Sequence, residues 1–125
     1  MGVKKILIVD DEPFILKLYT IILGNAGYEI DNAINGYKAL EKLESTIYNL
    51  VLLDIMMPEL DGLKTLEIIK NNDSYLNLKI IMLSALSGEN SVQKFKKLAD
   101  GYIVKSELEP RDLVNIVNSY LMNSE

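Results

Sequence analysis

Five short apolar runs alternate with longer segments of helical spacing along this chain, and that alternation limits the possible folds more than any other feature. The short runs are rich in β-branched residues and cover 6–9, 28–33, 50–54, 79–84 and 101–105. Helical spacing predicts helices over about 13–26, 36–43, 63–70, 89–98 and 110–122. Strict strand–helix alternation is typical of an α/β fold with a mostly parallel sheet. We expect the 125 residues to form one domain, 1–125.

The residue types that the chain lacks exclude several classes of site. It has no cysteine, which excludes a disulfide framework and a thiolate metal site. It has no histidine, which excludes a histidine base, metal ligand or phosphocarrier within the chain. A net charge of −5 argues against direct binding of nucleic acid. No segment predicts a membrane helix or a secretory signal, so we expect a cytoplasmic protein without a membrane partner.

Polar side chains stand where the predicted strands end. Parallel strands bring their carboxyl ends to one edge of a sheet, which is where ligands bind in α/β folds of this kind. The residues expected at this edge are Asp10 and Asp11 after the first strand, Asp54 in the third, Ser84 in the fourth and Lys105 in the fifth. The sequence therefore predicts a single site that contains three carboxylates, a hydroxyl and an ammonium group.

This set of groups suits a divalent cation and a phosphoryl group. Three crowded carboxylates repel one another unless a cation lies among them, and oxygen-only ligands favour Mg²⁺. The hydroxyl of Ser84 can donate to a phosphoryl oxygen, and Lys105 can pair with one. A carboxylate can itself act as the nucleophile and become an aspartyl phosphate.

Each of these residues, taken singly, has a plain structural interpretation. Asp10 or Asp11 could cap the helix that follows, and Asp54 could belong to a turn. Ser84 could be a hydrogen-bonded core hydroxyl, and Lys105 could be a solvated surface lysine. The functional interpretation rests on their occurrence as a set at successive strand ends.

The chain closely resembles a bacterial response-regulator receiver domain of two-component signalling. The resemblance covers almost the whole chain, and its motifs are specific in their order and spacing rather than singly. The matching pieces are Asp10 with Asp11, and the stretches 33–40, 52–62, 80–85 and 99–105. It implies a doubly wound five-stranded (βα)5 sheet of strand order 2-1-3-4-5.

The resemblance also implies a role for each residue of the metal site. Asp54 would be the phosphoacceptor and would contact Mg²⁺. Asp11 would bind the ion directly, and Asp10 mostly through water. The backbone carbonyl of Met56 would be the third protein ligand.

The remaining implied roles concern the phosphoryl group and its consequences. Ser84 and Lys105 would bind the phosphoryl group, and Tyr102 would be the switch aromatic, although a strand tyrosine is also an ordinary packing residue. A histidine kinase or phosphotransfer protein would donate the phosphoryl group. The resulting switch would act on a downstream protein or on an output domain outside this chain. The domain would catalyse only its own phosphorylation and slow dephosphorylation, so it would not be an enzyme for an outside substrate.

Ser106 departs from the usual family pattern, and Met56 leads to a hypothesis about the lifetime of the phosphoryl group. Ser106 follows Lys105 where the family usually has proline, often with a cis bond. A cis bond before serine costs about 3 kcal/mol, so we predict a trans bond. The side chain of Met56 cannot hydrogen-bond an attacking water well, which suggests a longer-lived phosphoryl group.

Two apolar surfaces have both a structural and a docking interpretation. Residues 92–99 would form either an amphipathic helix with a solvated face or a surface on which a partner docks beside Tyr102. Phe14, Ile15 and Leu18 would be either core residues or part of a surface on which the kinase docks.

Three other functions fit the sequence less well. A haloacid-dehalogenase-like phosphatase would need an aspartate where Met56 stands. A flavodoxin-like flavin carrier would need a loop rich in hydroxyls and glycine after the first strand, where this chain is acidic. A phosphorylation-independent interaction module would have no need of the complete acidic set.

Overall fold

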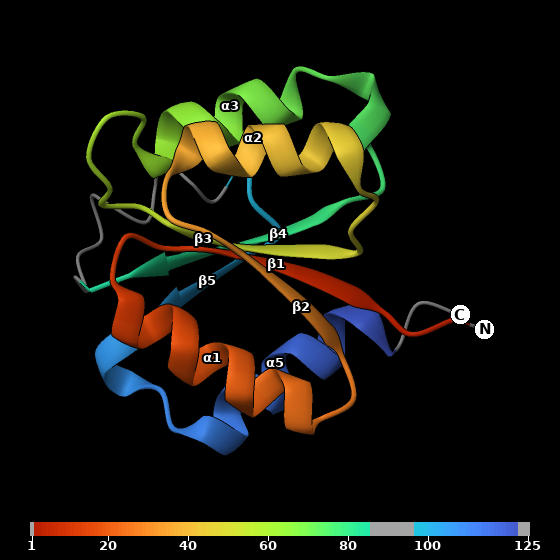
Figure 1. Ribbon diagram of the computed structural model, residues 1–125, viewed down its shortest axis with the longest axis vertical. Coiled ribbons are helices and arrows are strands. Elements are labelled where there is room, and N and C mark those ends of the chain that lie inside the picture. Colours follow the sequence, from red (N-terminus) through yellow and green to blue (C-terminus); the bar gives the residue numbers. More distant parts are fainter. Residues whose placement is uncertain (1, 86–96, 123–125) are drawn as a thin grey trace.

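The computed structural model describes residues 2–85 and 97–122, which contain a five-stranded parallel sheet (Figure 1). Its strand order is β2-β1-β3-β4-β5, which confirms the expected order 2-1-3-4-5. The strands are β1 (Lys5–Val9), β2 (Glu29–Ala33), β3 (Leu50–Asp54), β4 (Lys79–Ser84) and β5 (Gly101–Val104). The predicted α/β class with a doubly wound parallel sheet is confirmed.

Helices cover both faces of the sheet. Helices α1 (Pro13–Asn25) and α5 (Pro110–Leu121) lie on one face, and α2 (Gly36–Ser45) and α3 (Gly62–Lys70) on the other (Figure 1). Two short 3-10 turns, η1 (Asp73–Tyr75) and η2 (Lys105–Glu107), precede β4 and follow β5. Most of the helix predicted over 89–98 lies outside the described residues, as does most of the segment 92–99.

The central strands explain why a run such as LVLL, at 50–53, is apolar at every position instead of alternating with polar residues. Strands β1 and β3 are covered by helices on both sides, so each of their faces needs apolar side chains. Leu7 and Val51 pack into the cluster beneath α2 and α3, whereas Ile6 and Leu52 pack beneath α1 and α5. All four are fully buried, and truncating a buried leucine to alanine costs about 2–5 kcal/mol.

Local capping signals start the helices close to the sheet edge that carries the aspartates. The side chains of Asn35 and Asp61 accept backbone N–H bonds from Lys38 and Lys64, each at 2.8 Å, at the starts of α2 and α3. Pro13 begins α1, where the backbone N–H that proline lacks would have had no hydrogen-bond partner within the helix. The loops between the strand ends and these helices are therefore held in place.

The apolar residues of α1 divide between core and surface. Ile15 and Leu18 are partly buried and pack against the core beneath α1 and α5. Phe14 is 73% exposed, so its ring remains available to a partner. Across residues 2–85 and 97–122, no helix has the length and apolar character needed to cross a membrane.

Candidate functional site

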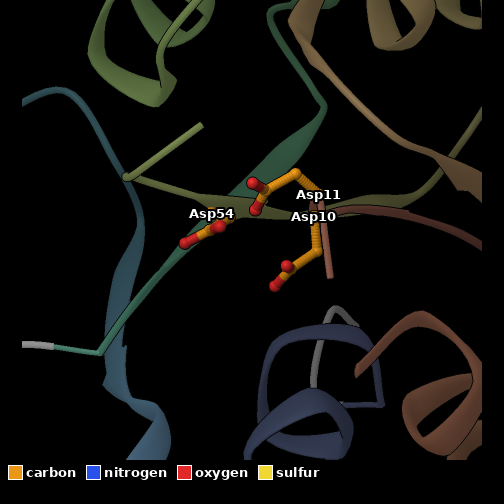
Figure 2. A group of neighbouring side chains, drawn as sticks. All are labelled: Asp10, Asp11 and Asp54. Carbon is orange, nitrogen blue, oxygen red and sulfur yellow. The ribbon is translucent and has the colours of Figure 1, made fainter. Parts of the chain in front are cut away.

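Asp10, Asp11 and Asp54 converge at the carboxyl end of the sheet (Figure 2). Strands β1 and β3 pair in parallel with Val9 opposite Leu53, so Asp10 and Asp54, the next residues, become neighbours. One carboxylate oxygen from each aspartate lies within 4.8 Å of the others. Asp10 and Asp54 are buried, whereas Asp11 is exposed. The predicted carboxylate cluster is thus present.

Lys105 points into this cluster from the end of β5. Its Nζ lies 2.6 Å from Oδ2 of Asp10 and 3.4 Å from Oδ1 of Asp54. Glu12, which was not among the residues predicted for the site, lies 3.9 Å from the same ammonium. Glu12 directly follows Asp10 and Asp11 in the sequence and lies in the turn before α1. Its position next to the two aspartates could therefore have identified it as a candidate site residue.

The pKa values in the site follow from this crowding. Burial, and then the charge of Asp10, raises the pKa of Asp54 to about 7, although Lys105 and the N–H of Met56 oppose the rise. Burial lowers the pKa of Lys105, but its hydrogen bond to Asp10 and the surrounding carboxylate charges outweigh burial and raise it. The site therefore disfavours the ionised form of Asp54 beside Asp10 and favours the cationic form of Lys105.

The cluster has the composition that a hard divalent cation prefers. Its candidate ligands are all oxygen atoms, and no nitrogen or sulfur ligand is possible from histidine or cysteine. Asp10 and Asp54 are buried and, among the described residues, share the one ammonium of Lys105, so an added cation would balance the excess negative charge. The donor set accordingly fits Mg²⁺.

Ser84 lies on β4, the strand next to Asp54, and Tyr102 lies on β5, one strand further away. Ser84 ends β4, is 1% exposed, and stands one residue beyond Leu83, the strand partner of Asp54. Tyr102 is half-buried in β5 and packs against the cluster beneath α2 and α3. Ser84 therefore stands at the strand end where the sequence placed it, and Tyr102 is the second residue of β5.

The β3–α3 loop is shaped by contacts that the sequence did not predict. The backbone N–H of Met56 donates to Oδ1 of Asp54 at 3.4 Å, and the Met56 side chain is 60% exposed. A Cβ on Gly62 would lie 2.3 Å from the carbonyl oxygen of Asp54, so only glycine permits this approach. Glu59 has a φ of 67°, in the region that favours glycine.

The segment after β5 corrects one detail and confirms another. The strand was expected to reach Lys105, but it ends at Val104 and Lys105 begins the 3-10 turn η2. The backbone turns at Lys105, and the Lys105 side chain points toward Asp10. No cis peptide occurs among the described residues, so the predicted trans bond between Lys105 and Ser106 is confirmed.

Comparison with known proteins identifies the family of this chain. The model of the family described as "Response regulator receiver domain" matches residues 6–118. The chain belongs to this family. As a receiver domain, it is a signalling switch of two-component systems rather than a classical enzyme.

Individual relatives agree with this assignment. The transcriptional regulatory protein ResD of Bacillus subtilis is 42% identical over 94% of this chain, and protein PilG of Pseudomonas aeruginosa is 29% identical over 94% of it. The match covers 48% of ResD and 87% of PilG, so this chain spans about half the length of ResD and most of the length of PilG.

Solved structures have the same architecture. The response regulator TrrA from Thermotoga maritima, in complex with Mg²⁺-BeF, is 42% identical with a TM-score of 0.83 over 94% of this chain and 99% of TrrA. Chemotaxis protein CheY4 of Vibrio cholerae is 27% identical with a TM-score of 0.90 over 96% of this chain and 100% of CheY4.

Proposed function

We propose that this receiver domain accepts a phosphoryl group on Asp54 from the phosphohistidine of a histidine kinase or phosphotransfer protein. The observation that carries the proposal is the convergence of three carboxylates and one ammonium group at a single sheet edge. A carboxylate oxygen of Asp54 would form a bond to phosphorus while the phosphorus–nitrogen bond of the donor breaks. The bonding electron pair would leave with the imidazole nitrogen.

The environment of Asp54 favours its role as the nucleophile. Burial and the nearby charge of Asp10 raise the pKa of Asp54 to about 7, which makes its ionised form more basic than an exposed aspartate. Asp10 has a second role, because its Oδ1 accepts the backbone N–H of Glu12 at 2.9 Å and fixes the turn before α1.

We propose that Asp10, Asp11, Asp54 and the backbone carbonyl of Met56 hold Mg²⁺. The bound ion would supply positive charge against the phosphoryl oxygens. The oxygen-only donor set supports this assignment. The complex of TrrA, a 42% identical response regulator, with Mg²⁺-BeF also supports it.

Lys105 and Ser84 would bind the transferred phosphoryl group. The ammonium of Lys105 lies 3.4 Å from Asp54 and could pair with a phosphoryl oxygen attached there. Ser84 ends the strand beside Asp54 and could donate its hydroxyl to another such oxygen. Both contacts would favour the conformation that the phosphorylated domain adopts.

Movement of Tyr102 would carry the signal to a partner surface. Tyr102 lines a cavity of about 340 Å³ between β5 and α5, together with Val104 and Ile116. A side chain at this boundary can change the shape of the β5–α5 surface when it moves. The output would be a downstream protein or an attached output domain, and the cell compartment would be the cytoplasm.

Intact-mass spectrometry after incubation with acetyl phosphate tests the proposal. We expect one added phosphoryl group that requires Mg²⁺ and is absent from Asp54→Asn. Asp73→Asn, at an exposed aspartate in η1, is the matched control and should behave as the wild type. An unmodified wild-type protein that also fails to bind Mg²⁺ would contradict the proposal and favour a phosphorylation-independent interaction module.

A further inference from the structure

The connections α2–β3 and α3–β4 enclose a cavity of about 290 Å³. Asn49 lines this cavity directly before β3 begins, and Asp54 ends the same strand. The cavity and the acidic site therefore lie at opposite ends of β3. Both connections lie at the end of the sheet where β1, β3 and β4 begin (Figure 1). No residue of the phosphorylation site contributes to the cavity.

The inner wall of the cavity is apolar and fixed in position. Leu43, Tyr48 and Leu78 line it and belong to the buried core cluster, and the half-buried Tyr75 packs against the same cluster. The hydroxyl of Tyr48 donates to Oδ2 of Asp31 at 2.6 Å, which orients its ring. Two aromatic rings and two leucines thus form a preformed apolar surface, as small-molecule sites usually have.

The polar groups of the cavity are amides and hydroxyls. The side-chain oxygen of Asn49 accepts the backbone N–H of Lys5 at 2.8 Å, so its orientation is set and its NH2 group is left as the donor. Asn77 adds a second amide from an exposed position. Every residue that lines the cavity is uncharged. Like any tyrosine, Tyr48 is neutral near pH 7, and burial, aided by the bond to Asp31, raises its pKa further, to about 12.

Exposed apolar side chains flank the cavity. Ile47 lines it and is 90% exposed, and Leu76, between two lining residues, is 77% exposed. These two side chains enlarge the apolar surface that a bound molecule could contact. No lining residue can form an ion pair with a charged ligand, and the two charged groups recorded against the lining, Asp31 and Lys5, already contact Tyr48. A charged ligand would therefore lose hydration without gaining an ion pair from the lining.

We propose that this cavity binds a small, neutral, planar aromatic compound that carries a hydrogen-bond acceptor. Its ring would contact Tyr48, Tyr75 and the two buried leucines. Its acceptor would face the side-chain NH2 of Asn49. The cavity volume is at the lower end of the range for small-molecule sites, so the ligand is of fragment size.

An NMR titration of the full chain with benzamide tests the proposal. Benzamide is neutral and planar and carries an acceptor, whereas benzoate has the same shape and a negative charge. We expect saturable shifts of the backbone amides of Tyr48, Asn49 and Tyr75, with an affinity on the order of millimolar. Benzoate should bind at least about tenfold more weakly.

Two tryptophan variants separate binding in the cavity from adsorption to the surface. Asn77→Trp places an indole at the cavity and should abolish the benzamide shifts, whereas Asn71→Trp, exposed and outside the lining, should preserve them. Both variants should keep the wild-type melting temperature and acetyl phosphate reactivity. Equal binding of benzoate, no shifts at the three amides, or unchanged binding in Asn77→Trp would overturn the proposal. Shifts around Ile47 that depend on protein concentration alone would also overturn it, in favour of contact with a second copy.

Discussion

Replacing Asp54 by asparagine should stabilise the metal-free protein at neutral and alkaline pH. Asp54 is 3% exposed, and its pKa is raised from 3.8 to about 7, by burial first and by Asp10 second. Because the folded protein holds this proton more tightly than the unfolded chain, ionising Asp54 costs folding free energy. Asparagine keeps the shape of the side chain and removes that cost.

The size of the effect follows from the shift. About three pKa units at about 1.4 kcal/mol each set an upper limit of roughly 4 kcal/mol above pH 7. That limit already includes the opposing contact with Lys105, but an amide that is less well hydrogen-bonded than the carboxyl would reduce the gain, so we expect about 1–4 kcal/mol. Below about pH 4 both forms of the protein carry a neutral group at position 54, and the gain should vanish. It should grow as the pH rises from 4 to 7.

Urea unfolding between pH 4 and 8, with a chelator present, measures this difference. Asp73→Asn, at an exposed aspartate, should change the free energy of unfolding by less than about 0.5 kcal/mol at any of these pH values. Adding Mg²⁺ should favour the wild type and narrow the gap. An Asp54→Asn protein no more stable than the wild type at pH 8 would refute the electrostatic reasoning.

Three further predictions concern the loop after β3. Glu59→Gly should stabilise the protein by about 1 kcal/mol in urea unfolding because φ is 67° there, whereas Glu44→Gly, in the exposed face of α2, should cost about 1 kcal/mol. Gly62→Ala should cost about 1–3 kcal/mol and slow acetyl phosphate labelling, because its Cβ would displace the backbone of Asp54; unchanged stability and rate would contradict this. Met56→Asn should shorten the lifetime of the phosphorylated form measured by intact mass, since an amide can orient the attacking water; an unchanged decay rate would refute the idea.

The elements were largely predictable because each depends on local pattern. The bounds expected for β3 and β4 match the structure to the residue, since an apolar run with a polar residue at its end marks a buried strand. Helix α2 extends two residues beyond the predicted end, to Ser45, because polar residues in its last turn carry no apolar signal. The strand order came from the family resemblance, not from periodicity.

The clustering of the candidate site residues was predictable, but their individual contacts were not. Parallel strands place their last residues at one edge, and this rule alone brought Asp10, Asp54 and Lys105 together. The 2.6 Å contact between Lys105 and Asp10 depends on how β5 turns into η2, which no local pattern encodes. The same holds for the fit of Gly62 against Asp54 and for the cavity at the opposite end of β3, which joins two connections far apart in the sequence.

The most direct test of the proposed phosphorylation is to locate the phosphoryl group on the chain. After incubation with acetyl phosphate and Mg²⁺, borohydride reduction converts an aspartyl phosphate to a stable product that peptide mass mapping can assign to one residue. We predict reduction at Asp54 alone, dependent on Mg²⁺. Reduction at Asp10 or Asp11 in the wild type, or at a residue outside the cluster, would contradict the assignment of Asp54 as the phosphoacceptor.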